Sequence, residues 1–365
     1  MSVSRFEITS GGLRSDIVVG ESVARLPKAL LKLVRPGAHV VVISDAAVSQ
    51  SFGKPLVRGL KAAGYDVSIV PVPSGERSKT LAQAGRLYHE LARCRVERGS
   101  WLIALGGGVV GDLTGFVAAT YLRGVPFVQV PTTLLAQVDA SIGGKTGVDI
   151  PEGKNLVGSF YHPRLVWIDP VLLRSLPNAH WRNGMAEVIK YGAIADAKLF
   201  RLLEAKIGRL MKGYSAAWIP IIARCAQIKA SVVQKDPRET RGLRAILNFG
   251  HSVGHAIEAA TGYLAYRHGE AISIGMFAAG WLSQQRGLLD AVDRIRLGTL
   301  LTKAGLPLRV RKPIARERLM WYLARDKKVE RGAIKFVLLR GLGQAVPGQA
   351  VEPEALAAAL AASGL

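Results

Sequence analysis

Short β-branched segments alternate with helical segments through the first half of the chain, and this alternation limits the possible folds more than any other feature. The predicted strands are residues 38–45, 65–72, 101–105, 127–131 and 165–169. The segment 81–94 between two of them repeats its apolar residues at helical spacing. Strands that alternate with helices form a mostly parallel sheet with helices on both faces. The first half is therefore predicted to be an α/β domain.

The pattern changes after Pro177, where β-branched runs become scarce. We expect helices at 220–234, 252–262 and 352–365, with a short pair of strands near 334–339. A mainly α-helical second domain follows from this pattern. The predicted domains are residues 1–178 and 179–365.

The chain has 365 residues and a formal net charge of +22. Such a charge has three possible explanations: binding of nucleic acid, a basic solvated surface, or attraction of small anionic substrates. The basic residues are spread along the chain, without an arginine-rich tail or a basic run interleaved with aromatic residues. This distribution argues against a nucleic-acid partner.

The compartment is predicted from the two cysteines and the N-terminal residues. Cys94 and Cys225 cannot form a disulfide framework, and reduced thiols are typical of the cytosol. The first twenty residues carry charges and no apolar run of the signal-peptide type. We expect a soluble cytoplasmic protein with no membrane partner.

A glycine-rich turn, Gly106-Gly-Gly-Val-Val-Gly-Asp112, follows a predicted strand and opens a predicted helix. Its spacing fits G-x-G-x-x-G, in which backbone N–H groups and a helix N-terminus hold a pyrophosphate. The usual acidic residue about 20 positions later is missing. A Rossmann-like nucleotide site is one interpretation, and a tight turn for close strand–helix packing is the other.

Three further loops combine glycine, lysine or hydroxyl residues: Pro131-Thr-Thr133, Gly143-Gly-Lys-Thr146 and Gly153-Lys-Asn155. The second resembles the end of a Walker A loop but lacks its first glycine, because Asp139 stands at that position. Each loop alone could be only a turn. Together they suggest a site for an anionic nucleotide and an anionic substrate.

Three of the seven histidines are clustered in the second half of the chain: His251, His255 and His268. Two imidazoles together with the carboxylate of Glu187 would make a three-ligand Zn²⁺ site with an open position. His251 and His255 share a helical face, which favours that pair, but spacing alone does not decide which histidines bind. Hydrogen-bonded core histidines are the alternative.

These segments resemble the 3-dehydroquinate synthase family, within the wider sugar-phosphate cyclases, from about Asp45 to Lys328. The resemblance implies a dehydroquinate synthase-like fold. The matching strings are Ser74-Gly-Glu76, Gly106-Gly-Gly-Val-Val-Gly-Asp112, Pro131-Thr-Thr133, Val138-Asp-Ala-Ser-Ile-Gly-Gly-Lys145, Gly153-Lys-Asn155, Gly184-Met-Ala-Glu-Val-Ile-Lys190, Leu247-Asn-Phe-Gly-His-Ser-Val-Gly-His255, His268-Gly-Glu270 and Asp326-Lys-Lys328.

The resemblance implies the cofactors and the residues that contact them. Zn²⁺ or Co²⁺ would be bound by Glu187, His251 and His268, whereas His255 would transfer protons. NAD would be lined by Asp45, Ser74, Glu76, Lys79, Gly106, Gly107, Gly108, Val109, Val110, Gly111, Asp112, Thr132, Thr133, Lys145 and Lys154. The catalytic and substrate-binding set would be Arg123, Asp139, Lys145, Asn155, Lys190, Lys229, Arg244, Asn248, His255 and one of Lys327 and Lys328.

The reaction that the resemblance implies is a carbon–oxygen lyase step of the shikimate pathway. It turns 3-deoxy-D-arabino-heptulosonate 7-phosphate into 3-dehydroquinate and phosphate through transient oxidation by NAD, phosphate elimination, re-reduction and aldol closure. Arg123 matches a family arginine that reaches the neighbouring subunit, which implies a homodimer.

Two related activities are alternatives to this reaction. One is a cyclase for sedoheptulose 7-phosphate or glucose 6-phosphate, which lack the carboxylate. The other is a metal-dependent polyol dehydrogenase, which would release NADH.

Overall fold

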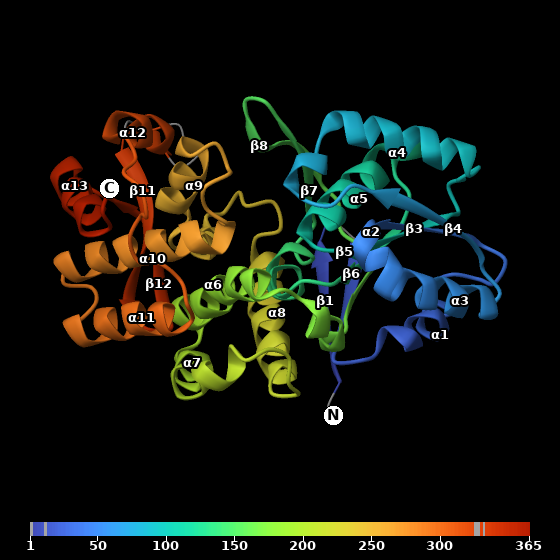
Figure 1. Ribbon diagram of the computed structural model, residues 1–365, viewed down its shortest axis with the longest axis horizontal. Helices are drawn as coiled ribbons and strands as arrows, with labels where there is room; N and C mark the ends of the chain where they lie inside the picture. Colours follow the sequence, from blue (N-terminus) through green and yellow to red (C-terminus); the bar gives the residue numbers. More distant parts are fainter. Residues whose placement is uncertain (1–2, 11–12, 325–328, 331–332) are drawn as a thin grey trace. The chain divides into compact units, whose positions relative to one another are not determined.

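The computed structural model describes residues 3–10, 13–324, 329–330 and 333–365 (Figure 1). The chain divides into two compact units. The first comprises Met1–Leu176 with Trp218–Gln234, and the second comprises Pro177–Ala217 with Lys235–Leu365. Helix α8 (Trp218–Lys235) thus groups with the first unit, although it lies in the second predicted domain. The predicted domains, 1–178 and 179–365, follow chain order alone, which cannot reveal such a return.

A seven-stranded sheet forms the centre of the first unit. Its strands, in sheet order, are β1 (Ser4–Ser10), β2 (Leu13–Val19), β9 (Leu165–Ile168), β6 (Phe127–Pro131), β5 (Trp101–Gly106), β3 (His39–Asp45) and β4 (Asp66–Val72). β1 and β2 pair antiparallel, and the neighbours from β2 to β4 pair parallel. The predicted mostly parallel sheet is confirmed. The β1–β2 hairpin was outside the prediction.

The first unit contains both regular helices and short helical turns. The helices are α1 (Leu26–Leu30), α2 (Ala46–Val48), α3 (Lys54–Ala62), α4 (Leu81–Arg93), α5 (Gly108–Thr120) and α8. The 3-10 turns are Val23–Arg25, Glu76–Ser78, Tyr121–Arg123 and Pro170–Ser175, and the π turns are Ser49–Gly53 and Ala136–Ala140. Each of the helices α2 and α4 begins with a side-chain cap, from Asp45 and Thr80 respectively.

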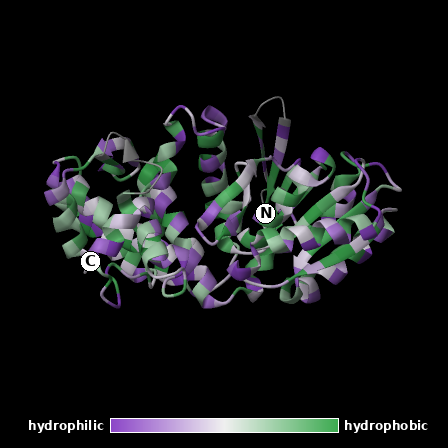
Figure 2. Cartoon of the chain, turned by 90° about the horizontal axis from the view of Figure 1, so that it is seen from above, coloured by the Kyte–Doolittle hydropathy of each residue, from purple (hydrophilic) through white to green (hydrophobic). Residues whose placement is uncertain are grey.

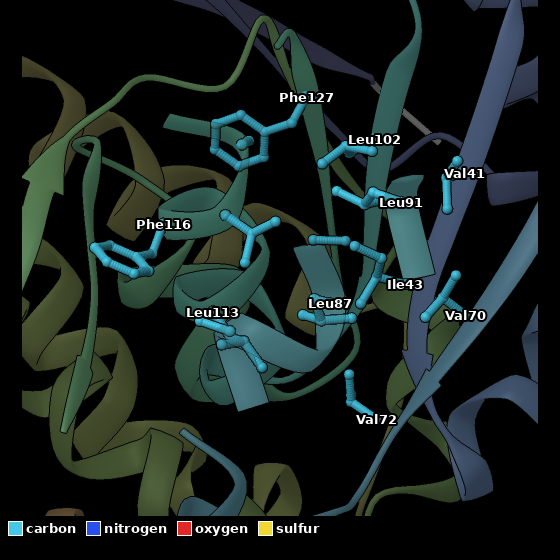
Figure 3. Close-up of a cluster of buried hydrophobic side chains, with 14 of the residues drawn as sticks. Val41, Ile43, Val70, Val72, Leu87, Leu91, Leu102, Leu113, Phe116 and Phe127 are labelled. Carbon is cyan, nitrogen blue, oxygen red and sulfur yellow. The ribbon is translucent and has the colours of Figure 1, made fainter. Parts of the chain in front are cut away.

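Alternate residues of the central strands pack on opposite faces of the sheet. Val41 and Ile43 of β3 lie in one apolar cluster with residues of α4 and α5 (Figure 3). Val40 and Val42 lie in a second cluster with residues of α1 and α3. Successive side chains of a strand point to opposite faces, and a parallel sheet is normally covered on both. The continuous apolar run 40–43 follows from burial on both sides.

A separate hairpin, also outside the prediction, follows the π turn of Ala136–Ala140. It consists of β7 (Lys145–Ile150) and β8 (Gly153–Phe160), paired antiparallel. A Cβ atom on Gly158 would lie 2.3 Å from the carbonyl oxygen of Thr146, so the two strands approach too closely there for a side chain. Leu156 and Phe160 remain exposed on β8.

The second unit is mainly helical, as predicted. Its helices are α6 (Asn178–Ala195), α7 (Ala197–Leu210), α9 (His251–Ala260), α10 (His268–Gln285), α11 (Ala291–Lys303), α12 (Arg316–Ala324) and α13 (Pro353–Ala362), with the 3-10 turn η7 (Leu243–Asn248). Its strands are β10 (Val329–Glu330), β11 (Ala333–Gly341) and β12 (Gln344–Ala350). The strand pair predicted near 334–339 corresponds to β11 alone, because its partner β12 lies beyond that range. α13 is the predicted terminal helix.

The helices carry hydrophobic and hydrophilic residues in mixed order (Figure 2), which is typical of helices with one buried face and one exposed face. Within the described ranges, none of the helices combines the length and the apolarity needed to cross a bilayer.

Candidate active site

The carboxyl edge of the first unit's sheet gathers several predicted cofactor residues. β3 lies between β4 and β5 in the sheet. The chain runs from β3 to its neighbour β4 on one side and then crosses to β5 on the other side of β3. Open α/β sheets bind ligands at such a reversal, outside the carboxyl ends of the strands. Asp45 ends β3 and Gly106 ends β5. The Thr132 N–H donates to the Gly106 carbonyl over 2.9 Å, which brings the end of β6 to the same edge.

The glycine-rich turn connects β5 to α5. Gly107 is the N-cap of α5, so the first N–H groups of the helix follow directly after the strand. A Cβ on Gly106 would lie 2.6 Å from Val110, and one on Gly111 would lie 2.6 Å from the Gln129 side chain. Gly106 and Gly111 thus permit close strand–helix packing, as one interpretation requires. The nucleotide-site interpretation stays a prediction, for which Gly107 and Gly108 supply the start of a helix.

Lys79 is the centre of a polar network in the first unit, and its side chain is almost fully buried. Its Nζ donates to Asp112 on α5 and to the side-chain oxygen of Asn155 on β8. Burial by itself lowers the pKa of Lys79, but the Asp112 carboxylate outweighs burial, so the pKa is raised. The ammonium is charged at neutral pH and connects the glycine-rich turn to the β7–β8 hairpin.

Asn155 has a left-handed backbone, with φ of +56°. Its N–H donates to Asp149 Oδ1 over 2.9 Å, and the Asp149 N–H donates to the Lys79 carbonyl over 2.7 Å. Lys154 Nζ lies 3.5 Å from Glu76 Oε1. Four of the predicted contact residues, Lys79, Glu76, Lys154 and Asn155, are thus close together although two separate chain segments supply them.

Asp139 and Lys229 form another charged pair of this unit. Asp139 lies in the π turn, and Lys229 reaches it from α8 with distances of 3.0 Å to Oδ1 and 2.7 Å to the carbonyl oxygen. π turns are frequent at functional sites.

The remaining predicted residues of the first unit either form local hydrogen bonds, lie on the surface or belong to the first turn of α5. Asp45 Oδ1 accepts from the N–H groups of Ala47 and Val48, which caps α2. Thr133 Oγ1 accepts from the Ala136 N–H. The exposed positions are Ser74, Arg123 and Lys145, and Val109 and Val110 lie in the first turn of α5.

Three helices of the second unit bring Glu187, His251 and His268 together. Glu187 lies within α6, whereas His251 and His268 are the first residues of α9 and α10. One ligand atom from each residue lies within 4.8 Å of the others. Each Nε2 is 3.5 Å from Glu187 Oε1. The three side chains therefore aim at a common point.

Other groups hold each of these three side chains in place. His251 Nδ1 lies 3.1 Å from the Phe249 carbonyl oxygen, and His268 Nδ1 lies 3.1 Å from Glu258 Oε2. Lys190 Nζ contacts Glu187 Oε2 in the buried interior. Both Nδ1 atoms donate because their partners accept, which leaves each Nε2 directed toward Glu187.

Burial by itself lowers the pKa of His268, but the Glu258 and Glu187 carboxylates outweigh it and raise that pKa to about 10. This site thus favours positive charge, and a cation bound there would take the place of the Nε2 proton.

Sequence reasoning missed Glu258. The signal that could have found it is helical spacing, because His251, His255 and Glu258 recur at intervals of four and three residues on α9. Among the described residues, Glu258 forms a second potential ligand group with His255 and His268, and neither group contains both His251 and His255. His255 is exposed, with its ring centroid 5.2 Å from that of His251.

Glycines set the spacing of the three helices. A Cβ on Gly269 would lie 2.3 Å from the carbonyl oxygen of Asn183 on α6, and one on Gly254 would lie 2.6 Å from Ile272 on α10. The Gly269 N–H also donates to Asn183 Oδ1. Because these backbones are in contact, α6 and α9 both lie close enough to α10 for their ligands to meet.

A loop held by the buried Asp236 carries Arg244 and Asn248. Its carboxylate accepts from the N–H groups of Thr240, Arg241 and Arg244. Burial by itself raises the pKa of Asp236, but these backbone donors outweigh it and lower the pKa. No local sequence pattern marks Asp236.

The two substrate candidates on this loop are also held by neighbours. The Arg244 guanidinium donates to the Pro237 carbonyl over 3.0 Å, and Asn248 Nδ2 lies 3.4 Å from Glu239 Oε1. The predicted Lys327 and Lys328 lie outside the described residues.

Two family profiles cover most of the chain without interruption. The profile of the 3-dehydroquinate synthase N-terminal part matches residues 69–183, and that of the 3-dehydroquinate synthase C-terminal part matches residues 184–329. The chain belongs to the 3-dehydroquinate synthase family. A family relative from Synechocystis sp., a 3-dehydroquinate synthase, is 48% identical over 329 residues, which cover 89% of this chain and 90% of the relative.

Solved structures extend the likeness of this 3-dehydroquinate synthase family chain to related cyclases. The 2-epi-5-epi-valiolone synthase of Streptomyces hygroscopicus subsp. jinggangensis 5008, solved with NAD⁺ and Zn²⁺, is 29% identical with a TM-score of 0.88 over 98% of both chains. A 2-deoxy-scyllo-inosose synthase with carbaglucose-6-phosphate, NAD⁺ and Co²⁺ is 26% identical, with a TM-score of 0.86 over 98% of this chain and 99% of its own.

The residues of this 3-dehydroquinate synthase family chain fit both kinds of cofactor chemically. One carboxylate oxygen and two imidazole nitrogens are a ligand set that Zn²⁺ uses in catalytic sites with an open position. Two helix N-termini, those of α9 and α10, begin at this set and favour an anion beside the metal. In the first unit, the start of α5 offers N–H groups to a pyrophosphate.

Proposed function

We propose that this chain is a 3-dehydroquinate synthase that converts 3-deoxy-D-arabino-heptulosonate 7-phosphate into 3-dehydroquinate and phosphate. The observation that carries the proposal is the convergence of Glu187, His251 and His268 in a chain of this family. The enzyme would be a carbon–oxygen lyase of aromatic amino acid biosynthesis in the cytoplasm.

In this proposal, separate groups of residues bind the two cofactors. The turn of Gly106–Gly111 and the start of α5 would hold the NAD pyrophosphate, with Glu76, Lys79 and Asp112 beside it. Glu187, His251 and His268 would hold Zn²⁺ or Co²⁺. When bound, NAD⁺ accepts and returns a hydride, and the metal ion polarises the hydroxyl that is oxidised.

Cationic side chains would bind the two anionic groups of the substrate. Lys190 is buried and already contacts the metal-ligand candidate Glu187, so its ammonium would lie near the reacting carbon. Arg244 is held by the Asp236 loop and offers a planar donor pair to a carboxylate or phosphate. Lys145, Lys229, Asn155, Asp139 and Asn248 would complete the contacts. His255, exposed beside the two ligand histidines, would move protons.

The proposal includes a homodimer in which Arg123 reaches the neighbouring subunit. Leu122 and Arg123 both have left-handed backbones, with φ of +49° and +64°, which bulky residues rarely adopt. Strained backbone conformations of this kind are common at functional sites. The Tyr161 hydroxyl lies beside Gly124 and donates to the Val125 carbonyl over 2.9 Å, and Leu122 of the turn is an exposed apolar side chain.

A second candidate is a cyclase for sedoheptulose 7-phosphate, which the fold likeness to the valiolone synthase favours. Phosphate release from each substrate, with NAD⁺ and with or without a chelator, separates the two candidates. Chelator-sensitive release from the heptulosonate phosphate alone, without accumulation of NADH, supports the dehydroquinate synthase. Release from sedoheptulose 7-phosphate alone supports the second candidate, and release from neither refutes both.

A further inference from the structure

Glu258 is a buried carboxylate on α9 that the proposed mechanism does not use. It is 4% exposed and lies two turns after His251 on the same helix. Its Oε2 is 3.1 Å from Nδ1 of His268, the first residue of α10. A carboxylate in the protein interior costs free energy unless it is paired, so this contact accounts for its presence there.

The contact determines which nitrogen of His268 faces the metal position. A carboxylate only accepts hydrogen bonds, so His268 Nδ1 carries a hydrogen. The lone pair that remains for a metal is then on Nε2, which is 3.5 Å from Glu187 Oε1. Without Glu258 the ring could rotate or change its tautomer, and either change would remove the lone pair from that point.

His251 provides an internal comparison within the same site. Its Nδ1 faces the carbonyl oxygen of Phe249, two residues away along the chain. A backbone carbonyl holds that ring, and no side-chain substitution removes it. The orientation of His268, by contrast, depends on a side chain from another helix, which makes the role of Glu258 open to mutation.

We propose that Glu258 is a positioning residue that fixes the tautomer and ring orientation of His268 for metal binding. The inference rests on the proposed function, because it requires the metal site of Glu187, His251 and His268. Histidine ligands commonly donate their second N–H to a carboxylate, and loss of such a partner weakens metal affinity by about 10–100-fold. The competing view is that Glu258 is itself a ligand of a second cation, together with His255 and His268.

The test compares the full-length chain with Glu258→Ala, Glu258→Gln and a control variant, Glu204→Gln. Glu204 is a carboxylate of the same unit that pairs with Arg296 instead of a histidine. Zn²⁺ affinity and stoichiometry are measured by competition with a chromophoric chelator. We expect one Zn²⁺ per chain, a loss of about 10–100-fold in affinity for Glu258→Ala, a smaller loss for Glu258→Gln, which keeps an acceptor, and no change for Glu204→Gln.

Two further readouts separate positioning from a general loss of structure. Nitrogen-15 NMR of histidine-labelled protein should show a hydrogen on His268 Nδ1 in the parent and in Glu258→Gln but a changed state in Glu258→Ala. Unchanged affinity in a folded Glu258→Ala variant would overturn the inference, as would a second bound Zn²⁺ that disappears with Glu258. If the parent and His268→Ala bind Zn²⁺ equally, the metal site of the proposed function is wrong instead.

Discussion

A Cβ atom on Gly275 of α10 would lie 1.9 Å from the carbonyl oxygen of Gly250, the residue before α9. No rotamer change removes this clash, because both partners are backbone. His251 directly follows Gly250, so the contact sets the distance between the helices that carry the two candidate ligand histidines.

Gly275→Ala should therefore push α9 and α10 apart. We expect lower Zn²⁺ affinity and a stability loss of about 1–3 kcal/mol, the range typical of overpacked cores. Calorimetry and chelator competition measure the two effects. Gly208→Ala on α7 is the matched control, because a Cβ there meets nothing within 4 Å, and this helical change should stabilise by about 0.5–1 kcal/mol. Equal effects of the two substitutions would contradict the packing argument.

His268→Ala should lose bound metal and activity together, because it removes one of three ligand atoms. Elemental analysis after dialysis, combined with phosphate release, measures both. His89→Ala, at an exposed position of α4, is the control and should change neither. A His268→Ala protein with full metal content would refute the ligand assignment.

Arg123→Ala should weaken substrate binding, because it removes a guanidinium from a strained, exposed turn. In a homodimer with shared sites, mixing it with an inactive Lys190→Ala variant should restore partial activity. Arg93→Ala, an exposed arginine paired with Glu90, should behave like the parent. If mixed samples stay inactive although mixed dimers form, the sites are not shared.

Lys79→Met should weaken NAD⁺ binding and destabilise the first unit by about 3 kcal/mol, because Asp112 loses its counter-charge. Adding Asp112→Asn should recover part of the stability, because the uncompensated charge is gone, without recovering NAD⁺ affinity. Thermal unfolding and titration calorimetry follow the two properties. Parallel recovery of both in the double variant would show that Lys79 acts on NAD⁺ only through stability.

Asp236→Asn should cost about 1–3 kcal/mol at neutral pH, because the carboxylate accepts several backbone N–H groups. Its pKa is lowered in the folded protein, so its contribution is present above the unfolded pKa of about 3.9 and is lost as the pH falls through the folded value. The difference in the free energy of unfolding between the parent and Asp236→Asn should therefore become smaller as the pH falls. Asp66→Asn, at an exposed strand start, should show no such difference. A difference that stays constant down to acid unfolding would contradict the assignment.

Elements with a local signal could be predicted from the residues alone. β3 was readable from 38–45 because a strand buried on both faces is continuously apolar, and α13 because its alanine-rich segment favours a helix. The glycine-rich turn could be recognised because its glycines lie close together in the sequence. The ligand set of Glu187, His251 and His268 came from resemblance, since spacing alone favoured His251 with His255.

The contacts between groups far apart in the chain follow from the packing of the elements. Glu258 reaches His268 because glycine contacts bring α9 close to α10, and Asp236 organises the Arg244 loop through backbone donors that no residue pattern marks. Helix α8 joins the first unit, where Lys229 meets Asp139. Helix and strand periods depend on neighbours in the chain, whereas these contacts depend on how separate elements pack, and local sequence carries little information about that packing.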